Sequence, residues 1–328
     1  MAKADNALQE YWDDEEKFAD LFNAKLFGGE KVILPEKLSE LDSRGTMKIS
    51  GKGKKESVST SVYRDLVKVT KIYKEYGIEL VILGLENQEH IHYAMPIRVM
   101  GYDYSEYKKQ YRKNARKYKE NPKGLTPDEF LSKMKRSDKF YPVITIVLYY
   151  GEKVWDGAKT LHEVLNISER IKPFVNDYGI HLVEVRENDL PLRNENNQDL
   201  FKLCSIVLDT KKPDEQKKKE AIQYEREHRI NEEVLYALAD ITNYDLCEEK
   251  RGAMNMCTFF DHLVEQGIEQ GVICQTLKKI AKNLSPEQTA DMLEADINTI
   301  RQIYNIKAAN PEYNEKEIYE AMQVGKSN

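Results

Sequence analysis

The chain has 328 residues with 50 Lys/Arg against 56 Asp/Glu, a net charge of −6, so it can form one large or two modest domains and is not a uniformly basic nucleic-acid binder. No run of about 18 apolar residues occurs, and the first residues lack the basic and apolar regions of a secretory signal, so neither a membrane span nor secretion is expected. The four cysteines lie far apart, without the spacing of a zinc site or a disulfide framework, which fits a reducing cytoplasm.

Charged residues are unevenly distributed along the chain. Residues 105–139 contain twelve Lys/Arg against five acids, residues 48–74 contain eight against two, and residues 1–30 contain eight acids against three lysines. Basic faces on an acidic protein can still bind phosphate groups. The alternative is that these stretches are solvated helix faces.

The first expected element is an amphipathic helix over residues 8–27, which Gly28 and Gly29 end. Its polar stripe contains Glu16, Asp20 and Asn23 at helical spacing. Such a stripe is usually the wet face of the helix, but here it could also supply a third carboxylate to a site.

Residues 31–47 suggest a short strand and a turn, and the Gly/Lys-rich residues 50–57 suggest a flexible segment that does not have the spacing of a P-loop. Residues 62–76 fit both a helical stripe and a strand, so their structure stays open. In either case Asp65 lies close to the start of the element.

The most informative stretch is the apolar run 80–85, which ends abruptly in Glu86, Asn87 and Gln88. A continuous apolar run of this length predicts a strand buried on both faces. Glu86 and Gln88 are two residues apart and are therefore expected on one face of that strand. A buried strand that ends in a carboxylate is a candidate for chemistry.

The following elements alternate between helix and strand. A helix is expected from Met95 into a tyrosine- and arginine-rich stretch, with another starting at Thr126. The patterns then indicate, in chain order, a central strand, a short strand and a helix over residues 139–150, 181–185 and 199–208. Such alternation predicts an α/β fold with helices on the faces of a sheet.

The charged residues 209–220 are the predicted linker between a first domain, 1–208, and a helical region, 221–328. Residues 285–304 suggest two short helices around a turn. This pair is either a packing or dimerisation element, which we favour, or a DNA-reading helix-turn-helix.

Asp65 and Glu86 are the two acids that stand against an apolar background. Mg²⁺ prefers hard oxygen ligands and commonly takes one or two carboxylates, so this pair could hold one ion, with Gln88 orienting water or binding phosphate. Acids at this spacing are common by chance. His90 and His92 are interpreted as surface residues, and no other catalytic motif is present.

Several stretches resemble the Rpn family of recombination-promoting nucleases, also described as transposase-like, within the PD-(D/E)XK nuclease superfamily. The resemblance covers nearly the whole chain and rests on YWDDEEKFADLFNAKLFGG at 11–29, Tyr63-Arg64-Asp65, LGLENQEHIHYAMPIRVMGYD at 83–103, YPVITIVLYYGEKVWDG at 141–157 and the Gly-spaced residues 265–271.

The resemblance implies a mixed central sheet flanked by helices, in which residues 105–139 form a basic helical insertion. It places the acid of the first motif on Asp65 and the second motif on Glu86, Asn87 and Gln88. Arg64 stands where the superfamily has proline, and Gln88 stands where it has lysine. The lost positive charge implies slow or metal-exacting turnover. Glu16 and Asp20 both remain candidates for the acid of the first helix.

The preferred hypothesis is a cytoplasmic, Mg²⁺-dependent DNA endonuclease, with Mn²⁺ as a substitute, linked by the resemblance to recombination or mobile elements. Asp65, Glu86 and Gln88 would be catalytic, and the DNA-binding candidates are Arg64, Arg98, Lys108 and Arg112. For Arg98 the alternative is an ion pair with Asp103 or a wet helix face. A homodimer would provide the two sites that double-strand cutting needs. The competing hypothesis is a nuclease-fold protein that binds DNA or a protein without cutting.

Overall fold

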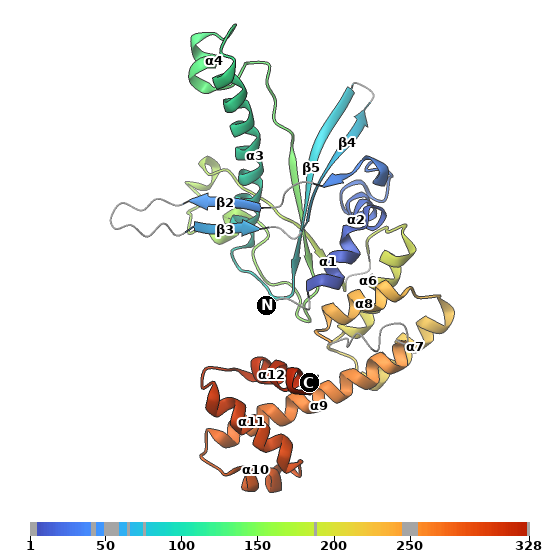
Figure 1. The fold of residues 1–328 in the computed structure, drawn as a ribbon. Helices are drawn as coiled ribbons and strands as arrows, with labels where there is room; N and C mark the ends of the chain where they lie inside the picture. The colour runs from blue at the N-terminus through green and yellow to red at the C-terminus, as the bar shows by residue number, and fades with distance from the viewer. Residues whose placement is uncertain are drawn as a thin grey trace. The chain divides into compact units, whose positions relative to one another are not determined.

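The computed structural model describes residues 5–40, 44–48, 59–63, 66–74, 77–186, 189–244 and 255–326. The chain divides into two compact units, Met1–Gly252 and Ala253–Asn328. Each unit has its own arrangement of elements, and the first contains the sheet (Figure 1).

The sheet of the first unit has five strands in the order β1-β4-β5-β6-β7. The pairs β1–β4 and β4–β5 are antiparallel, whereas β5–β6 and β6–β7 are parallel. The sheet is therefore mixed, and the α/β class expected from the sequence is confirmed. The strands are β1 (Ser39–Glu40), β4 (Leu66–Lys74), β5 (Gly77–Gln88), β6 (Val143–Tyr149) and β7 (His181–Glu184), and a separate ribbon pairs β2 (Arg44–Lys48) with β3 (Ser59–Tyr63).

Helices lie on both faces of this sheet: α3 packs against β6, and α1 lies against β4 (Figure 1). The helices of the unit are α1 (Asp5–Asp13), α2 (Glu15–Phe27), α3 (Met95–Glu120), α4 (Pro127–Ser132), α5 (Leu161–Val164), α6 (Glu195–Val207), α7 (Asp214–Glu227) and α8 (Glu232–Ile241), and two 3₁₀ turns span Pro35–Lys37 and Lys172–Phe174.

The predicted single helix over residues 8–27 is in fact two helices. Asp14 interrupts it with an extended backbone, and its side chain accepts hydrogen bonds from the backbone N–H groups of Glu16 and Lys17. An aspartate that caps the next helix in this way competes with helix continuation. The end at Gly28 agrees with the prediction, because this glycine has the left-handed conformation of a C-cap.

The ambiguous segment 62–76 contains strands. Leu66–Lys74 pairs residue by residue with Gly77–Leu85. The local pattern allows either a helix or a strand, and this cross-strand pairing selects the strand. Arg64 and Asp65, two of the predicted site residues, lie outside the described residues, as does the whole Gly/Lys-rich segment 50–57.

A buried lysine ties the sheet to the first two helices. Lys68 on β4 is 1% exposed, and its Nζ donates to the backbone carbonyl of Asp13. The same ammonium lies 3.3 Å from the Asp13 carboxylate and 3.8 Å from that of Glu15, with the Phe18 ring beside it. Burying an ammonium is costly unless it is paired and hydrogen-bonded, and these contacts supply both.

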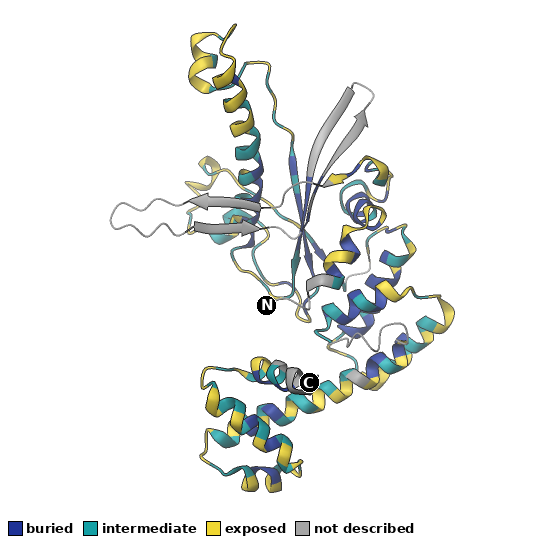
Figure 2. Cartoon of the chain, viewed as in Figure 1, coloured by how far each residue is buried: buried dark blue, intermediate teal, exposed yellow. Residues whose placement is uncertain are grey.

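The helix α3 changes character along its length. Met95 and Val99 pack with Val147, Tyr149 and Trp155 in an apolar cluster on the sheet. Further along, the helix is largely exposed as it runs towards α4 (Figure 2). The basic stretch predicted at 105–139 thus comprises the outer part of α3, α4 and the segment that returns to β6.

The predicted linker 209–220 differs from the structure. Asp214–Glu227 is helix α7, where Ala221 is buried and the Tyr224 hydroxyl donates to Asp199 on α6 at 2.7 Å. These contacts hold the charged segment within the first unit, and the division between units falls later, after Gly252.

The described part of the second unit consists of helices α9 (Met256–Ile280), α10 (Pro286–Leu293), α11 (Ile297–Ala309) and α12 (Glu315–Lys326). Its apolar cluster contains Ile273, Ile303, Ile318 and Met322. The two short helices predicted around a turn in residues 285–304 are confirmed as α10 and α11. Across the described residues of both units, no helix has the length and apolar composition that a bilayer span requires.

We predict that Lys68→Ala lowers the free energy of unfolding by about 2–4 kcal/mol, because it leaves a cavity and removes the donor to Asp13. Lys68→Met retains most of the buried stem and should cost less than half as much. Urea denaturation of the two variants and the wild type measures the difference. Equal losses for both variants would mean that the stem contributes nothing.

Candidate active site

Glu86 lies near the end of β5 and is 1% exposed. Side chains alternate between the two faces of a strand, so Leu83 and Leu85 are on the face opposite Glu86. Both leucines are completely buried. Glu86 therefore points towards the face covered by α3. A carboxylate this deeply buried requires hydrogen bonds and a countercharge.

Two side chains from α3 meet this carboxylate. Arg98 Nη2 lies 2.6 Å from Glu86 Oε1, and the Tyr102 hydroxyl donates to the same oxygen at 2.9 Å. Arg98 Nε also donates to the Tyr102 hydroxyl. Arg98 and Tyr102 are four residues apart, so one face of the helix presents both to the strand. For Arg98 the predicted alternative was an ion pair with Asp103, and the partner in the structure is Glu86.

Tyr102 remains a hydrogen-bond donor at neutral pH. Burial raises the pKa of Tyr102 well above its ordinary value, and the neighbouring Glu86 carboxylate raises it further. Asp103, the next residue, faces another direction and accepts from the Thr145 hydroxyl at 2.6 Å and from Tyr178. The sequence analysis missed Tyr102, although its place one helical turn after Arg98 was a usable signal.

Gln88 shares the face of Glu86, as predicted. Its amide nitrogen lies 3.2 Å from Glu86 Oε1 and donates to the Asn87 carbonyl at 2.7 Å. The strand end is fixed from β6, because the Tyr150 N–H donates to the Gln88 carbonyl at 3.1 Å. Gly151 follows, and a Cβ there would lie 2.4 Å from the Glu89 carbonyl, so this close approach requires glycine.

The structure does not bring Glu16 or Asp20 to Glu86. Both are on α2, where Glu16 is exposed and Asp20 accepts from Asn197 Nδ2 at 2.9 Å and from the Arg193 N–H at 2.8 Å. Asp20 therefore anchors the start of α6. Asp65, the other predicted metal ligand, lies outside the described residues; the next residue, Leu66, pairs with Leu85, the residue before Glu86.

The two histidines lie at the surface, as predicted. The His90 side chain is 88% exposed, and His92 is also exposed. Partial burial lowers the pKa of His92, and the Arg98 charge lowers it further. His92 is therefore neutral at pH 7 and adds no positive charge beside Arg98.

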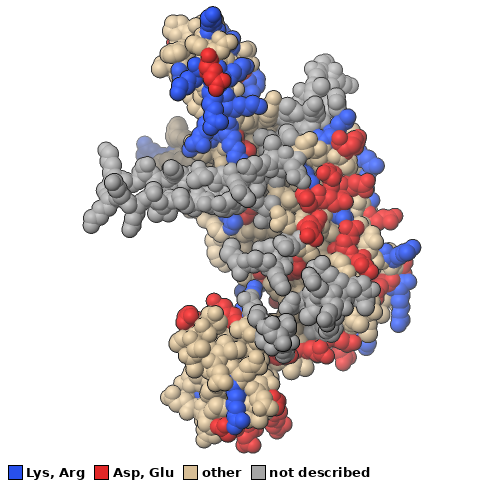
Figure 3. All heavy atoms as spheres, viewed as in Figure 1, with Lys and Arg blue, Asp and Glu red and all other residues tan. Residues whose placement is uncertain are grey.

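A stripe of cationic residues leads along α3 away from Glu86. Steps of three and four residues connect Arg98 through Tyr102 and Ser105 to Lys109, Arg112 and Arg116, and such steps keep one helix face. We call Arg98, Lys109, Arg112 and Arg116 the cationic stripe. Arg112 and Arg116 are exposed, and Lys and Arg side chains gather over this part of the molecule (Figure 3).

Two predicted DNA-binding residues, Lys108 and Arg112, are thus on the outer part of α3. Arg112 belongs to the cationic stripe. Lys108 lies beside it, with its ammonium 5.6 Å from the centre of the Tyr104 ring. Arg64 lies outside the described residues.

The donors that the described residues offer at this site are oxygens: the Glu86 carboxylate, the Gln88 side-chain amide and backbone carbonyls. This donor chemistry fits a hard divalent cation such as Mg²⁺. Among the described residues no three His, Cys, Asp or Glu side chains form a group that could hold a metal ion. The second carboxylate predicted for such an ion, Asp65, lies outside the described residues.

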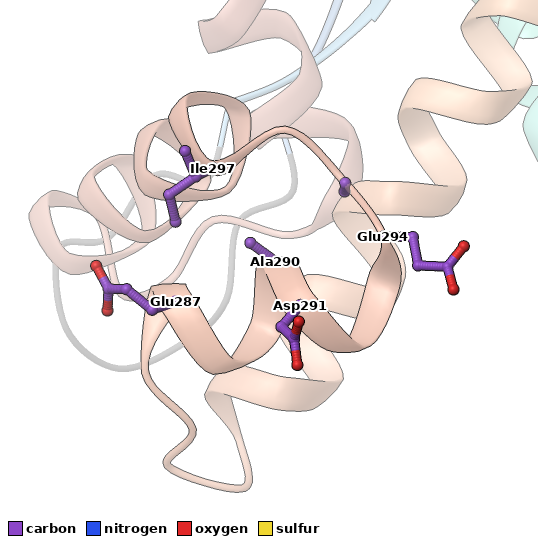
Figure 4. Close-up of a pocket in the computed structure, with 6 residues that line it drawn as sticks. Glu287, Ala290, Asp291, Glu294 and Ile297 are labelled. Carbon is purple, nitrogen blue, oxygen red and sulfur yellow. The ribbon is translucent and has the colours of Figure 1, made fainter.

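The second unit contains a pocket at the turn between α10 and α11, lined by Glu287, Ala290, Asp291, Glu294, Ala295 and Ile297. Its three carboxylates are spread around the pocket and do not converge (Figure 4). Glu287 is also paired with Arg301 at 2.9 Å. An acidic lining repels phosphate, so this pocket does not favour the DNA-reading interpretation of α10 and α11.

Comparison with known proteins adds no relative: no protein-family model matches the sequence, and neither a curated protein nor a solved structure matches the chain.

We predict that Arg98→Leu destabilises the first unit by about 2 kcal/mol, because the buried Glu86 carboxylate loses its guanidinium. Arg98 is about one-third exposed, which reduces the effect. Adding Glu86→Gln to Arg98→Leu should restore part of the loss. Urea denaturation of both single variants and the double variant measures this coupling. Additive losses would contradict it.

Proposed function

We propose that this chain is a divalent-metal-dependent DNA endonuclease of the Rpn family, with a PD-(D/E)XK nuclease fold. The observation that carries the proposal is the buried Glu86 carboxylate at the end of a central strand, from which the cationic stripe of α3 leads away. The order of elements β4, β5, α3 and β6, with antiparallel β4–β5 and parallel β5–β6 pairing, is compatible with this fold.

Glu86 would hold the metal ion together with Asp65. The pairing of Leu66 with Leu85 supports this choice, because these residues are the chain neighbours of the two acids. A bound Mg²⁺ or Mn²⁺ supplies a water of lowered pKa and offsets negative charge on the phosphate. Orientation of the water, binding of the phosphate and positioning of the carboxylate would come from the protein side chains of this site.

Gln88 would orient the attacking water or bind a phosphate oxygen, since its amide lies on the face of Glu86. It cannot supply the positive charge of the lysine that the superfamily has there. Arg98 is the cation nearest to the carboxylate and is one-third exposed, so its guanidinium can reach a phosphate as well as Glu86. Tyr102 holds the Glu86 carboxylate in place through its hydroxyl.

The cationic stripe would bind the DNA backbone. Arg98 and Arg116, the two ends of the stripe, are separated by about 27 Å along the helix axis, at 1.5 Å per residue. This length corresponds to about eight phosphates of one strand at 3.4 Å spacing along a duplex axis. Phosphate contacts of this kind give affinity without base readout, so weak sequence selectivity follows.

A catalytically weak or inactive nuclease-fold protein that binds DNA or another protein is the second candidate. The observation that favours it is the engagement of Glu86 Oε1 by Arg98, Tyr102 and the Gln88 amide, which compete with a metal ion for this oxygen. Calorimetry with Mg²⁺ separates the two. Absence of heat, together with retained DNA binding, would favour the second candidate.

We predict that Glu86→Gln reduces nicking of supercoiled plasmid in Mg²⁺ or Mn²⁺ at least a hundredfold, because the charge stabilisation that this change removes is several kcal/mol. Asp65→Ala should do the same. Asp199→Asn is the matched control, since Asp199 is also a buried acid of this unit but accepts from the Tyr224 hydroxyl on α7. Equal cutting by Asp65→Ala and wild type would remove the metal assignment.

We predict that replacing Arg112 and Arg116 by glutamine weakens binding to all duplex sequences alike. The slope of log affinity against log salt should become shallower by about 0.9 for each phosphate that the variant no longer neutralises. Fluorescence anisotropy over a salt series measures this slope. Lys172→Gln, a change to an exposed lysine on another part of the unit, should leave the slope unchanged.

A further inference from the structure

A row of exposed apolar and aromatic residues runs along a different face of α3 from the cationic stripe. Ile97, Tyr104 and Tyr111 are seven residues apart and are 44%, 53% and 40% exposed. Seven residues are close to two helical turns, so the three form one line along the helix. Six residues separate Arg98 from Tyr104, which places the line about 120° around the helix from the stripe, at 100° per residue.

Cations accompany the aromatic rings on this part of the unit. The Lys108 ammonium lies 5.6 Å from the centre of the Tyr104 ring, and the Lys133 ammonium lies 3.8 Å from that of Phe130. Phe130 is 52% exposed on α4. Exposed rings next to basic side chains are the combination on which proteins stack unpaired bases while they hold the phosphates.

Tyr111 and Phe130 stand on a preformed support, residues 108–141, which we call the arm, and Tyr104 precedes it on the same helix. Gln110 joins the outer part of α3 to the returning segment by two hydrogen bonds with the Tyr141 backbone, at 2.7 and 3.1 Å. The Tyr118 hydroxyl donates to Asp138 at 2.6 Å, and the Tyr111 hydroxyl donates to the Ser132 carbonyl at 3.1 Å. A surface held in this way loses little conformational freedom on binding.

We infer that α3 and the arm bind single-stranded DNA, with phosphates on the cationic stripe and bases on Tyr104 and Tyr111. The two rings are about 10.5 Å apart along the axis, so each can stack a different base of one strand. A duplex keeps its bases stacked inside, so it can use the stripe but not the rings. This inference deepens the proposed function and rests on it for cleavage: the substrate class would be DNA with an unpaired segment beside the cleaved phosphate.

Binding without cleavage tests the inference. The full chain, in EDTA, is titrated into labelled oligodeoxythymidine of 20 nucleotides and into a mixed-sequence duplex of 20 base pairs, and anisotropy is measured. Tyr104→Ala and Tyr111→Ala should each reduce affinity for the single strand about tenfold and change affinity for the duplex less than twofold. Replacing Arg112 and Arg116 by glutamine should weaken binding to both probes.

Matched controls keep the ring or remove a ring elsewhere. Tyr104→Phe retains the stacking surface and should bind like wild type. Phe174→Ala removes a ring that is 86% exposed on a different segment and should have no effect. Thermal unfolding of each variant checks that the arm remains folded. Equal losses on both probes, or no loss on either, would overturn the inference.

A second copy of the chain is the other occupant that a seven-residue apolar spacing suggests. Sedimentation of wild type and Tyr104→Ala distinguishes it. A dimer that dissociates in the variant while single-strand affinity is unchanged would overturn the inference. A different result separates this inference from the proposed function. If the wild type does not cut DNA but the tyrosine variants selectively lose single-strand binding, the nuclease proposal is wrong and the single-strand binding surface stands.

Discussion

The burial of the Glu86 carboxylate is the constraint on which the arrangement of the first unit depends. A charge at 1% exposure has lost its hydration, and the fold replaces that hydration with the Arg98 guanidinium and the Tyr102 hydroxyl. Both partners come from α3, so this helix must cross the sheet at one height and with one face inward. The Thr145 hydroxyl of β6, which donates to Asp103, fixes the same helix at a second point.

On the other face of the sheet a buried positive charge is likewise paired with groups from the neighbouring helices. Lys68 is as deeply buried as Glu86, and the ends of α1 and α2 bring Asp13 and Glu15 to its ammonium. The break between these helices at Asp14 is what places both acids there. Buried charge thus fixes helices to both faces of the sheet, and the apolar residues around it fill the remaining volume.

The sequence predicted the regular elements well where one pattern dominated. The apolar runs predicted at 80–85 and 139–150 lie in β5 and β6, and the helix expected from Met95 is α3. Sequence patterns do not show which side chains pair with residues far along the chain. Asp20 resembles an available acid on a polar stripe, but it is bonded to Asn197, 177 residues away. Tyr102 looks like one tyrosine among many, and only its contact with Glu86 gives it a role.

A single rigid helix relates the buried carboxylate to the surface that would receive DNA. Steps of three and four residues from Arg98 to Arg116 preserve one face, so the cationic residues on the outer part of α3 take their direction from the same contact that holds Arg98 on Glu86. The capped turn at Thr126 and the bonds of Gln110 and Tyr118 stop the far end of this helix from fraying. Because helix rise is fixed, the separation between a bound phosphate at Arg116 and the end of β5 is set by residue count. Inserting or deleting residues between Ser105 and Lys109 would change that separation and rotate the stripe by 100° per residue, which makes the number of residues in α3 part of the site.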